Sequence, residues 1–258
     1  MNLYRPLYFY LLLLSCALVP LDLLAAEPEQ VGAVDVAVET ENELYTFQEE
    51  HDRYGTGKFY QGREIARVMS WHGIEWLERD EREEEEKISL LIESLEFKPG
   101  MMVADVGAGS GVIARKIAPL ITPKGKVYAI DIQKEMLTAL KKKMEALDIH
   151  NVVPVLGEEA SPNLKEESVD LAFMVDVYHE FSYPYEMTQK LAKALKPGGK
   201  LVFVEYRKED PSVPILEVHK MSVEQVKKEM AQPEFGLKWS ETIDILPRQH
   251  IIIFERVK

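Results

Sequence analysis

From residue 81 onward, the chain alternates helical periodicity with short β-branched runs. An apolar stripe at the spacing i, i+3, i+4 and i+7 predicts a first helix, through Ile88, Leu91, Ile92 and Leu95. The acidic run 83–86 falls in the first turn of that helix, where negative charge complements the helix dipole. We therefore assign no further function to the run.

Five apolar runs predict buried strands, at residues 101–106, 126–130, 152–156, 169–175 and 200–205. Helical patterns separate them, most clearly at 133–147 and 186–195, and such alternation favours parallel pairing through right-handed crossovers. Two further runs, 237–246 and 250–257, are joined by three residues only, which is too short for a crossover, so they should pair antiparallel.

The first 26 residues differ from the rest of the chain. Arg5 precedes an apolar stretch over 7–19, and Leu24-Ala25-Ala26 follows as a candidate cleavage site with small residues. This is the order of a secretory signal peptide. A retained membrane anchor is the alternative, although the stretch is shorter than the roughly 20 residues that span a bilayer. We expect an exported, periplasmic or membrane-anchored protein, or a cytoplasmic one if the start codon is misplaced.

Cys16 is the only cysteine and lies inside this leader. Lipidation at Cys16 is an alternative to a plain leader cysteine. Cleavage of the leader would leave no thiol, so we expect no disulfide and no cysteine nucleophile.

Residues 27–50 are acidic and lack a sustained period, which predicts a linker. Residues 51–80 predict a helical cap or lid. Four of its side chains could close over a ligand or instead pack against the sheet, namely Tyr60, Arg63, Trp71 and His72.

The composition is typical of a soluble protein with a sizeable core, at 46% hydrophobic and 29% charged over 258 residues. A net charge of −13 argues against a broad grip on nucleic acid. The six histidines show no metal-ligand spacing along the sequence, so no metal is expected.

A glycine loop carries the strongest signal of chemistry. The first predicted strand runs through Asp105 into Gly107, Gly109 and Gly111, and such a turn brings a ligand against the backbone. Val112 stands where a dinucleotide-binding loop has its third glycine, which disfavours a closely packed pyrophosphate. Asp131 ends the second strand, where a carboxylate can accept both ribose hydroxyls, or alternatively cap the following helix.

These features resemble the class I S-adenosylmethionine-dependent methyltransferases. The stretch 103–111 (VADVGAGSG) is similar to that family's first motif, and 195–201 (LKPGGKL) is similar to its element before the fifth strand. Residues 57–65 and 177–181 resemble a little-characterised bacterial subgroup with leader-like N-termini. The resemblance implies an α/β Rossmann-like domain over 81–258, with strand order 3-2-1-4-5-7-6.

The resemblance also implies S-adenosylmethionine as cofactor. Asp105 and the amides of the three loop glycines would hold its amino acid end, and Asp131 its ribose. Glu158 or Glu159 would lie near the adenine, although both could equally belong to a solvated turn.

The segment after the fourth strand should point at the same pocket. His179 could accept a proton from a hydroxyl or ammonium acceptor, or Tyr178 or Glu180 could orient the acceptor instead. Asp176 should face the same pocket as a catalytic or cofactor-binding residue. A hydrogen-bonded histidine without catalytic duty is an equal alternative. We expect methyl transfer to a small-molecule acceptor, against two rivals on the same fold: a nicotinamide-dependent oxidoreductase and a non-catalytic binding or scaffold protein.

Overall fold

The computed structural model describes residues 44–257. The predicted leader at 1–26, with Cys16, and residues 27–43 of the predicted linker therefore lie outside the described residues. Among residues 44–257, no helix has the length and apolar character needed to cross a membrane.

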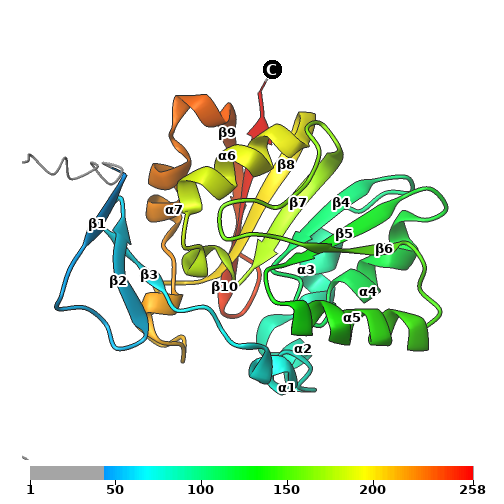
Figure 1. The fold of residues 1–258 in the computed structure, drawn as a ribbon, viewed down its shortest axis with the longest axis horizontal. Coiled ribbons are helices and arrows are strands. Elements are labelled where there is room, and N and C mark those ends of the chain that lie inside the picture. The colour runs from blue at the N-terminus through cyan, green and yellow to red at the C-terminus, as the bar shows by residue number, and fades with distance from the viewer. Residues whose placement is uncertain (1–43, 258) are drawn as a thin grey trace, which may run out of the picture. The chain divides into compact units, whose positions relative to one another are not determined.

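A seven-stranded sheet forms the centre of the domain (Figure 1). Its strands are β4 (Met102–Val106), β5 (Lys126–Asp131), β6 (Val152–Leu156), β7 (Val169–Val175), β8 (Leu195–Tyr206), β9 (Leu237–Ile243) and β10 (Gln249–Arg256). Their order is β6-β5-β4-β7-β8-β10-β9, which in chain order is 3-2-1-4-5-7-6. The predicted fold class and strand order are confirmed.

The first five strands of this sheet pair in parallel, because each connection returns the chain to the same edge; the connections after β4, β5 and β7 contain helices, and the one after β6 does not. β10 pairs antiparallel with both β8 and β9, as the short connection between the last two runs predicts. The carboxyl ends of β4, β5, β7 and β8 consequently lie at one edge of the sheet, where ligands bind in open α/β folds.

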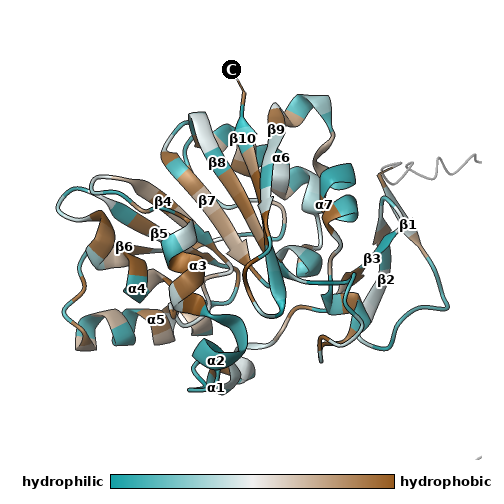
Figure 2. Ribbon diagram, turned by 180° about the vertical axis from the view of Figure 1, so that it is seen from behind, coloured by the Kyte–Doolittle hydropathy of each residue, from teal (hydrophilic) through white to brown (hydrophobic). Residues whose placement is uncertain are grey.

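Two apolar clusters bury the two faces of the sheet, because neighbouring strand residues point to opposite sides. Val103 and Val127 lie in one cluster with α3 (Ile88–Ser94), α4 (Ala114–Ile117) and α5 (Lys134–Ala146). Ala104 and Ile130 lie in the other, with α6 (Pro184–Ala194) and α7 (Val223–Met230). Figure 2 shows hydrophobic colouring along the central strands β7 and β8.

The predicted first helix is in fact two. α2 (Arg82–Glu86) ends at Lys87, whose φ of 56° is left-handed, and α3 begins at the next residue. The acidic run therefore lies on its own short helix and not in the first turn of α3. One of its members, Glu86, is buried at 1% exposure, so the run is more than a solvated face.

Residues 55–66 differ from the predicted helical cap. β2 (Gly55–Tyr60) and β3 (Arg63–Ala66) form a hairpin, and β1 (Tyr45–Phe47) adds a third antiparallel strand. The two turn residues, Gln61 and Gly62, have φ of 49° and 90°, as a two-residue hairpin turn requires. Helical structure in this region is confined to η1 (Trp71–Gly73) and α1 (Ile74–Leu77).

Polar contacts, some of them buried, hold the hairpin against the sheet domain. Arg63 forms a two-pronged ion pair with Glu229 of α7, at 2.7 and 3.0 Å, and also donates to the carbonyl of His179. Lys228 donates to the carbonyl of Gln61 at 2.6 Å. The chain that leaves β3 is thereby directed across the carboxyl edge of the sheet.

Candidate functional site

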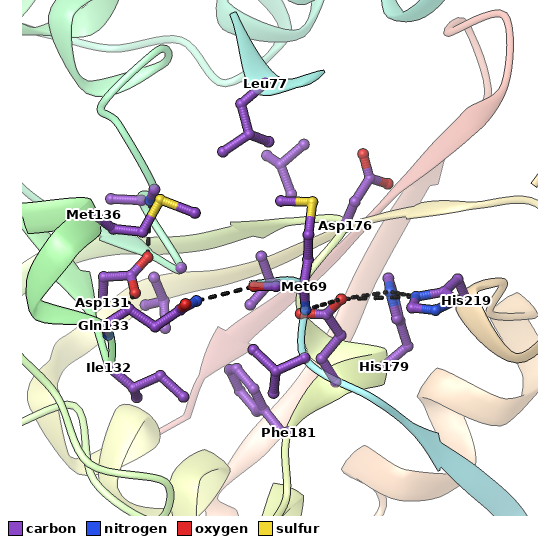
Figure 3. Close-up of a pocket in the computed structure, with 18 of the residues that line it drawn as sticks. Met69, Leu77, Asp131, Ile132, Gln133, Met136, Asp176, His179, Phe181 and His219 are labelled. Carbon is purple, nitrogen blue, oxygen red and sulfur yellow. Dashed lines mark hydrogen bonds and ion pairs between the residues drawn. The ribbon is translucent and has the colours of Figure 1, made fainter. Parts of the chain in front are cut away.

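A cavity of about 390 Å³ lies at the carboxyl ends of β4, β5 and β7. Figure 3 shows Asp131 and Gln133 on one side of it, His179 and His219 on the other, and Met69 between them. The size falls within the range of small-molecule sites.

Gly107 and Gly109 line this cavity, and both need to be glycine. Their φ angles are 73° and 55°, and an added Cβ would lie 2.5 Å from Val177 or 2.7 Å from Leu77. Their amides already donate within the chain, to the carbonyl of Ile130 and to Oδ2 of Asp131. The loop is therefore held in shape by its own hydrogen bonds. Its glycines let a ligand come close to the backbone, but the amides of Gly107 and Gly109 are not free to donate to that ligand.

Gly111 has a different role from the one predicted. It does not line the cavity, and its amide donates to the carbonyl of Ala108 at 2.9 Å. A Cβ here would lie 3.0 Å from Leu140, so the residue is small because α5 packs against it.

Asp105 is buried at 3% exposure at the end of β4. Its Oδ2 has no hydrogen-bond partner in the chain, and burial raises the pKa of its carboxyl to about 7. A buried carboxylate oxygen that lines a cavity and lacks a donor is suited to a ligand ammonium group.

Asp131 also lines the cavity and has a raised pKa because it is buried. Its Oδ1 accepts from the amide of Gln133 at 2.8 Å, and its Oδ2 from Gly109 at 3.0 Å. The contact with Gln133 orients the start of α5, whereas ribose binding by the Asp131 carboxylate stays a prediction.

Glu158 and Glu159 both reach the cavity lining from an exposed turn. Glu158 Oε1 accepts from the amide group of Asn163 at 3.3 Å, and its backbone bridges to Ser161. Either carboxylate can face a ligand that lies between this turn and Asp131.

The chain turns sharply where β7 ends. Asp176 has a left-handed φ of 55°, and the 3₁₀ helix η3 (Tyr178–Glu180) follows. Asp176 lines the cavity, with Oδ2 accepting from Gln249 at 2.8 Å and Oδ1 unpartnered. Burial, and then the charges of Glu86 and Glu205, raise the pKa of Asp176 well above its ordinary value.

Tyr178 is not at the cavity, contrary to the expectation that it contacts a ligand. The turn directs its ring back into the core, where it is fully buried against Phe203. Its hydroxyl donates to Glu229 at 2.7 Å. The residue therefore supports the Arg63–Glu229 pair.

His179 does line the cavity, but both ring nitrogens are engaged. Nδ1 lies 2.6 Å from Oε2 of Glu205, and Nε2 lies 3.1 Å from Nδ1 of His219. Burial lowers the pKa of His179 to about 4 and raises that of Glu205 to about 8. This environment makes His179 a weak general base at neutral pH.

Three potential metal ligands converge here, although the sequence shows no ligand spacing. Glu180 and His219 join His179, and one ligand atom from each lies within 4.8 Å of the others. His219 belongs to η4 (Glu217–His219), 40 residues from His179 along the chain, so the sequence does not reveal the cluster. Burial raises the pKa of Glu180 to about 7.

The residues that cover the cavity are not those predicted for a lid. Tyr60, Arg63, Trp71 and His72 do not line it. Tyr60 is buried within the hairpin, and Trp71 stacks on His72 near the surface. The covering side chains come instead from the connection after β3 and from α1: Val68, Met69, Trp76 and Leu77.

Arg82 and Glu86 also line the cavity, although no signal in the sequence marks either as a site residue. They pair at 2.6 Å with side chains 9% and 1% exposed, and Tyr206 donates to Glu86 at 3.0 Å. Arg82 supplies a positive charge among Asp105, Asp176 and Glu86, which otherwise concentrate negative charge at this edge.

Residues 104–201 match the model of a family described as a methyltransferase domain. That match covers the glycine loop, Asp131 and η3. The described chain also superposes on a solved S-adenosylmethionine-dependent methyltransferase from Aquifex aeolicus, with a TM-score of 0.68 and 26% identity over 74% of this chain and all of that one. The chain contains a class I S-adenosylmethionine-dependent methyltransferase domain.

The curated relatives that resemble this methyltransferase domain are named for different methyl acceptors. A protein-L-isoaspartate O-methyltransferase from Pyrococcus horikoshii is 32% identical over 115 residues, 45% of this chain and 49% of that protein. The ubiquinone/menaquinone biosynthesis C-methyltransferase UbiE from Wigglesworthia glossinidia brevipalpis is 25% identical over 121 residues, 46% of this chain and 48% of that one. The matched stretch therefore covers about half of either relative, and S-adenosylmethionine is the cofactor that family and fold imply.

Proposed function

We propose that this chain transfers the methyl group of S-adenosylmethionine to a small, largely apolar acceptor. The observation that carries the proposal is the unpartnered Oδ2 of Asp105 beneath the glycine loop, with the Asp131 carboxylate at the end of the neighbouring strand. Oδ2 of Asp105 suits an ammonium group, and the Asp131 carboxylate suits ribose hydroxyls.

The cavity residues fit the whole cofactor. Asp105 and the backbone of Gly107 would receive the amino acid end, and Asp131 would receive the ribose. The turn that carries Glu158 and Glu159 would border the adenine. The positive charge of Arg82 favours the ionised form of Asp105. An ionised Asp105 could then pair with the ammonium group of the cofactor.

The bound cofactor supplies a sulfonium-activated methyl group, so the chain mainly has to align the acceptor for in-line displacement. Met69 and Leu77 line the cavity and would shield part of a bound cofactor from water. The acceptor's lone pair would bond to the methyl carbon as the sulfur–methyl bond breaks and S-adenosylhomocysteine leaves. An ammonium acceptor would first have to lose a proton to free that lone pair, and a hydroxyl acceptor would release its proton to solvent as it reacts.

The acceptor end of the cavity is apolar with a polar cluster at one side. Phe181, Ile215 and Leu216 contribute apolar surface, while His179 and His219 lie beside them. We infer an acceptor with an apolar body and an oxygen or nitrogen that faces the histidines.

The test is a methyl-transfer assay with the full chain, a methyl-labelled cofactor and extracts fractionated by polarity. We expect label in small, organic-extractable products, and expect it to disappear in Asp131→Asn. Cofactor binding without labelled product from any fraction would argue against transfer and leave a binding protein.

A further inference from the structure

We propose that His179, Glu180 and His219 form a binding site for a divalent first-row transition-metal ion. The ligand atoms would be Nε2 of His179, Nδ1 of His219 and a carboxylate oxygen of Glu180. This inference goes beyond methyl transfer, and its test requires neither cofactor nor acceptor.

The distances between the three ligand atoms are close to those that a shared ion requires. Nε2 of His179 lies 3.1 Å from Nδ1 of His219, and Oε1 of Glu180 lies 4.0 Å from the first nitrogen and 3.7 Å from the second. Metal bonds of about 2.0–2.2 Å place neighbouring ligand atoms roughly 3.0–3.5 Å apart. A movement of about 0.5 Å by the Glu180 side chain would therefore complete the set.

A buried carboxylate supports the first ligand from behind. Glu205 is fully buried, and its Oε2 lies 2.6 Å from Nδ1 of His179. Its Oε1 accepts from the amide of Tyr178 at 2.9 Å, which fixes the carboxylate in place. A proton on Nδ1 directed at Glu205 leaves the Nε2 lone pair facing the cluster, which is the usual arrangement behind a metal-binding histidine.

The charges around the cluster also suit a divalent cation. Glu180 places a carboxylate beside the two imidazoles, and the Glu205 carboxyl group lies behind His179. The nearby cation, Arg63, is already paired with Glu229 at 2.7 Å. A divalent ion would compensate the negative charge that Glu180 and Glu205 carry once they are ionised.

Two imidazole nitrogens and one carboxylate suit zinc, iron, cobalt or manganese better than magnesium or calcium. All three side chains line the cavity, so the remaining coordination positions face it. An oxygen or nitrogen donor of a bound molecule could occupy one of those positions.

The test uses the tag-free full chain, stripped with a chelator and titrated with Co²⁺ in the visible spectrum and with Zn²⁺ by calorimetry. We expect one ion per chain and loss of saturable binding in His219→Ala. Glu205→Gln should weaken binding by about 10- to 100-fold, because it changes only the support behind His179. His150→Ala is the matched control, since His150 is exposed beside Asp148 and outside the cavity, and should not alter binding.

Absence of saturable binding by the wild-type chain, or equal affinity in His219→Ala, would overturn the proposal. X-ray absorption of the zinc-loaded wild type provides a readout that does not depend on the folding of variants. It should show two imidazole nitrogens at about 2.0–2.1 Å. A spectrum without imidazole scattering would refute the assignment.

Discussion

Replacement of Asp105 by Asn should have opposite effects on stability and on cofactor binding. Oδ2 of Asp105 is buried without a partner, and burial raises the pKa of the carboxyl from 3.8 to about 7. That difference corresponds to about 4 kcal/mol of destabilisation once the carboxyl is ionised above pH 7. A neutral amide avoids this cost, although it still needs hydrogen-bond partners, so we expect a net gain of about 2 kcal/mol.

The sign of the pH dependence follows from the direction of the shift. The folded chain holds a proton on Asp105 that the unfolded chain releases at lower pH, so this group's stabilising contribution is complete below pH 4 and disappears as the pH rises through about 7. The melting temperature of ligand-free Asp105→Asn should therefore exceed that of the wild type by about 4–8 °C at pH 8.5, with little or no gain at pH 5.

Binding should change in the other direction. Loss of a charge-assisted hydrogen bond to the cofactor's ammonium, worth about 1.5–3 kcal/mol, predicts roughly 10- to 150-fold weaker binding of S-adenosylhomocysteine by calorimetry at pH 8.5. Asp170→Asn is the control, because Asp170 pairs with Lys196 at 2.6 Å outside the cavity and should leave affinity unchanged. Unchanged affinity in Asp105→Asn, together with lower stability at both pH values, would refute the reasoning.

Three further changes test other parts of the structure. Gly109→Ala should lose about 1–3 kcal/mol of stability in urea unfolding and bind cofactor more weakly, because φ is 55° and the new Cβ would meet Leu77 at 2.7 Å; wild-type behaviour would contradict this geometry. Glu229→Gln leaves Arg63 buried without a charge partner and should cost about 3–5 kcal/mol in the same assay, whereas a loss below 1 kcal/mol would show that the pair is not buried. Trp76 is the only one of the three tryptophans, all within the described residues, that lines the cavity, so Trp76→Phe should remove the ligand-dependent fluorescence change, and a persisting change would place the ligand elsewhere.

The sheet was predictable because its signals are local. The runs that form the central strands β4, β7 and β8 are largely buried on both faces, and the short connection from β9 to β10 leaves no alternative to antiparallel pairing. The glycine loop was likewise recognisable from spacing alone. The distinct packing role of Gly111 was not, because it depends on where α5 crosses the loop.

In residues 61–69, a helical spacing of apolar residues and the signal of a β-hairpin point to different structures. Ile65, Val68 and Met69 fit a helical spacing, but Ile65 belongs to a strand while the other two belong to the connection that covers the cavity. Gln61-Gly62 between two short runs was the available signal of a hairpin. The cluster of His179 and His219 had no such signal, because it forms only when two distant turns meet over the sheet.

The central claim is that an S-adenosyl nucleoside binds across the ends of β4 and β5. Calorimetric titration of the full chain with S-adenosylhomocysteine tests it most directly. The account predicts saturable binding of one molecule per chain, weakened at least about tenfold in Asp131→Asn. No saturable heat at concentrations up to about 1 mM would contradict it.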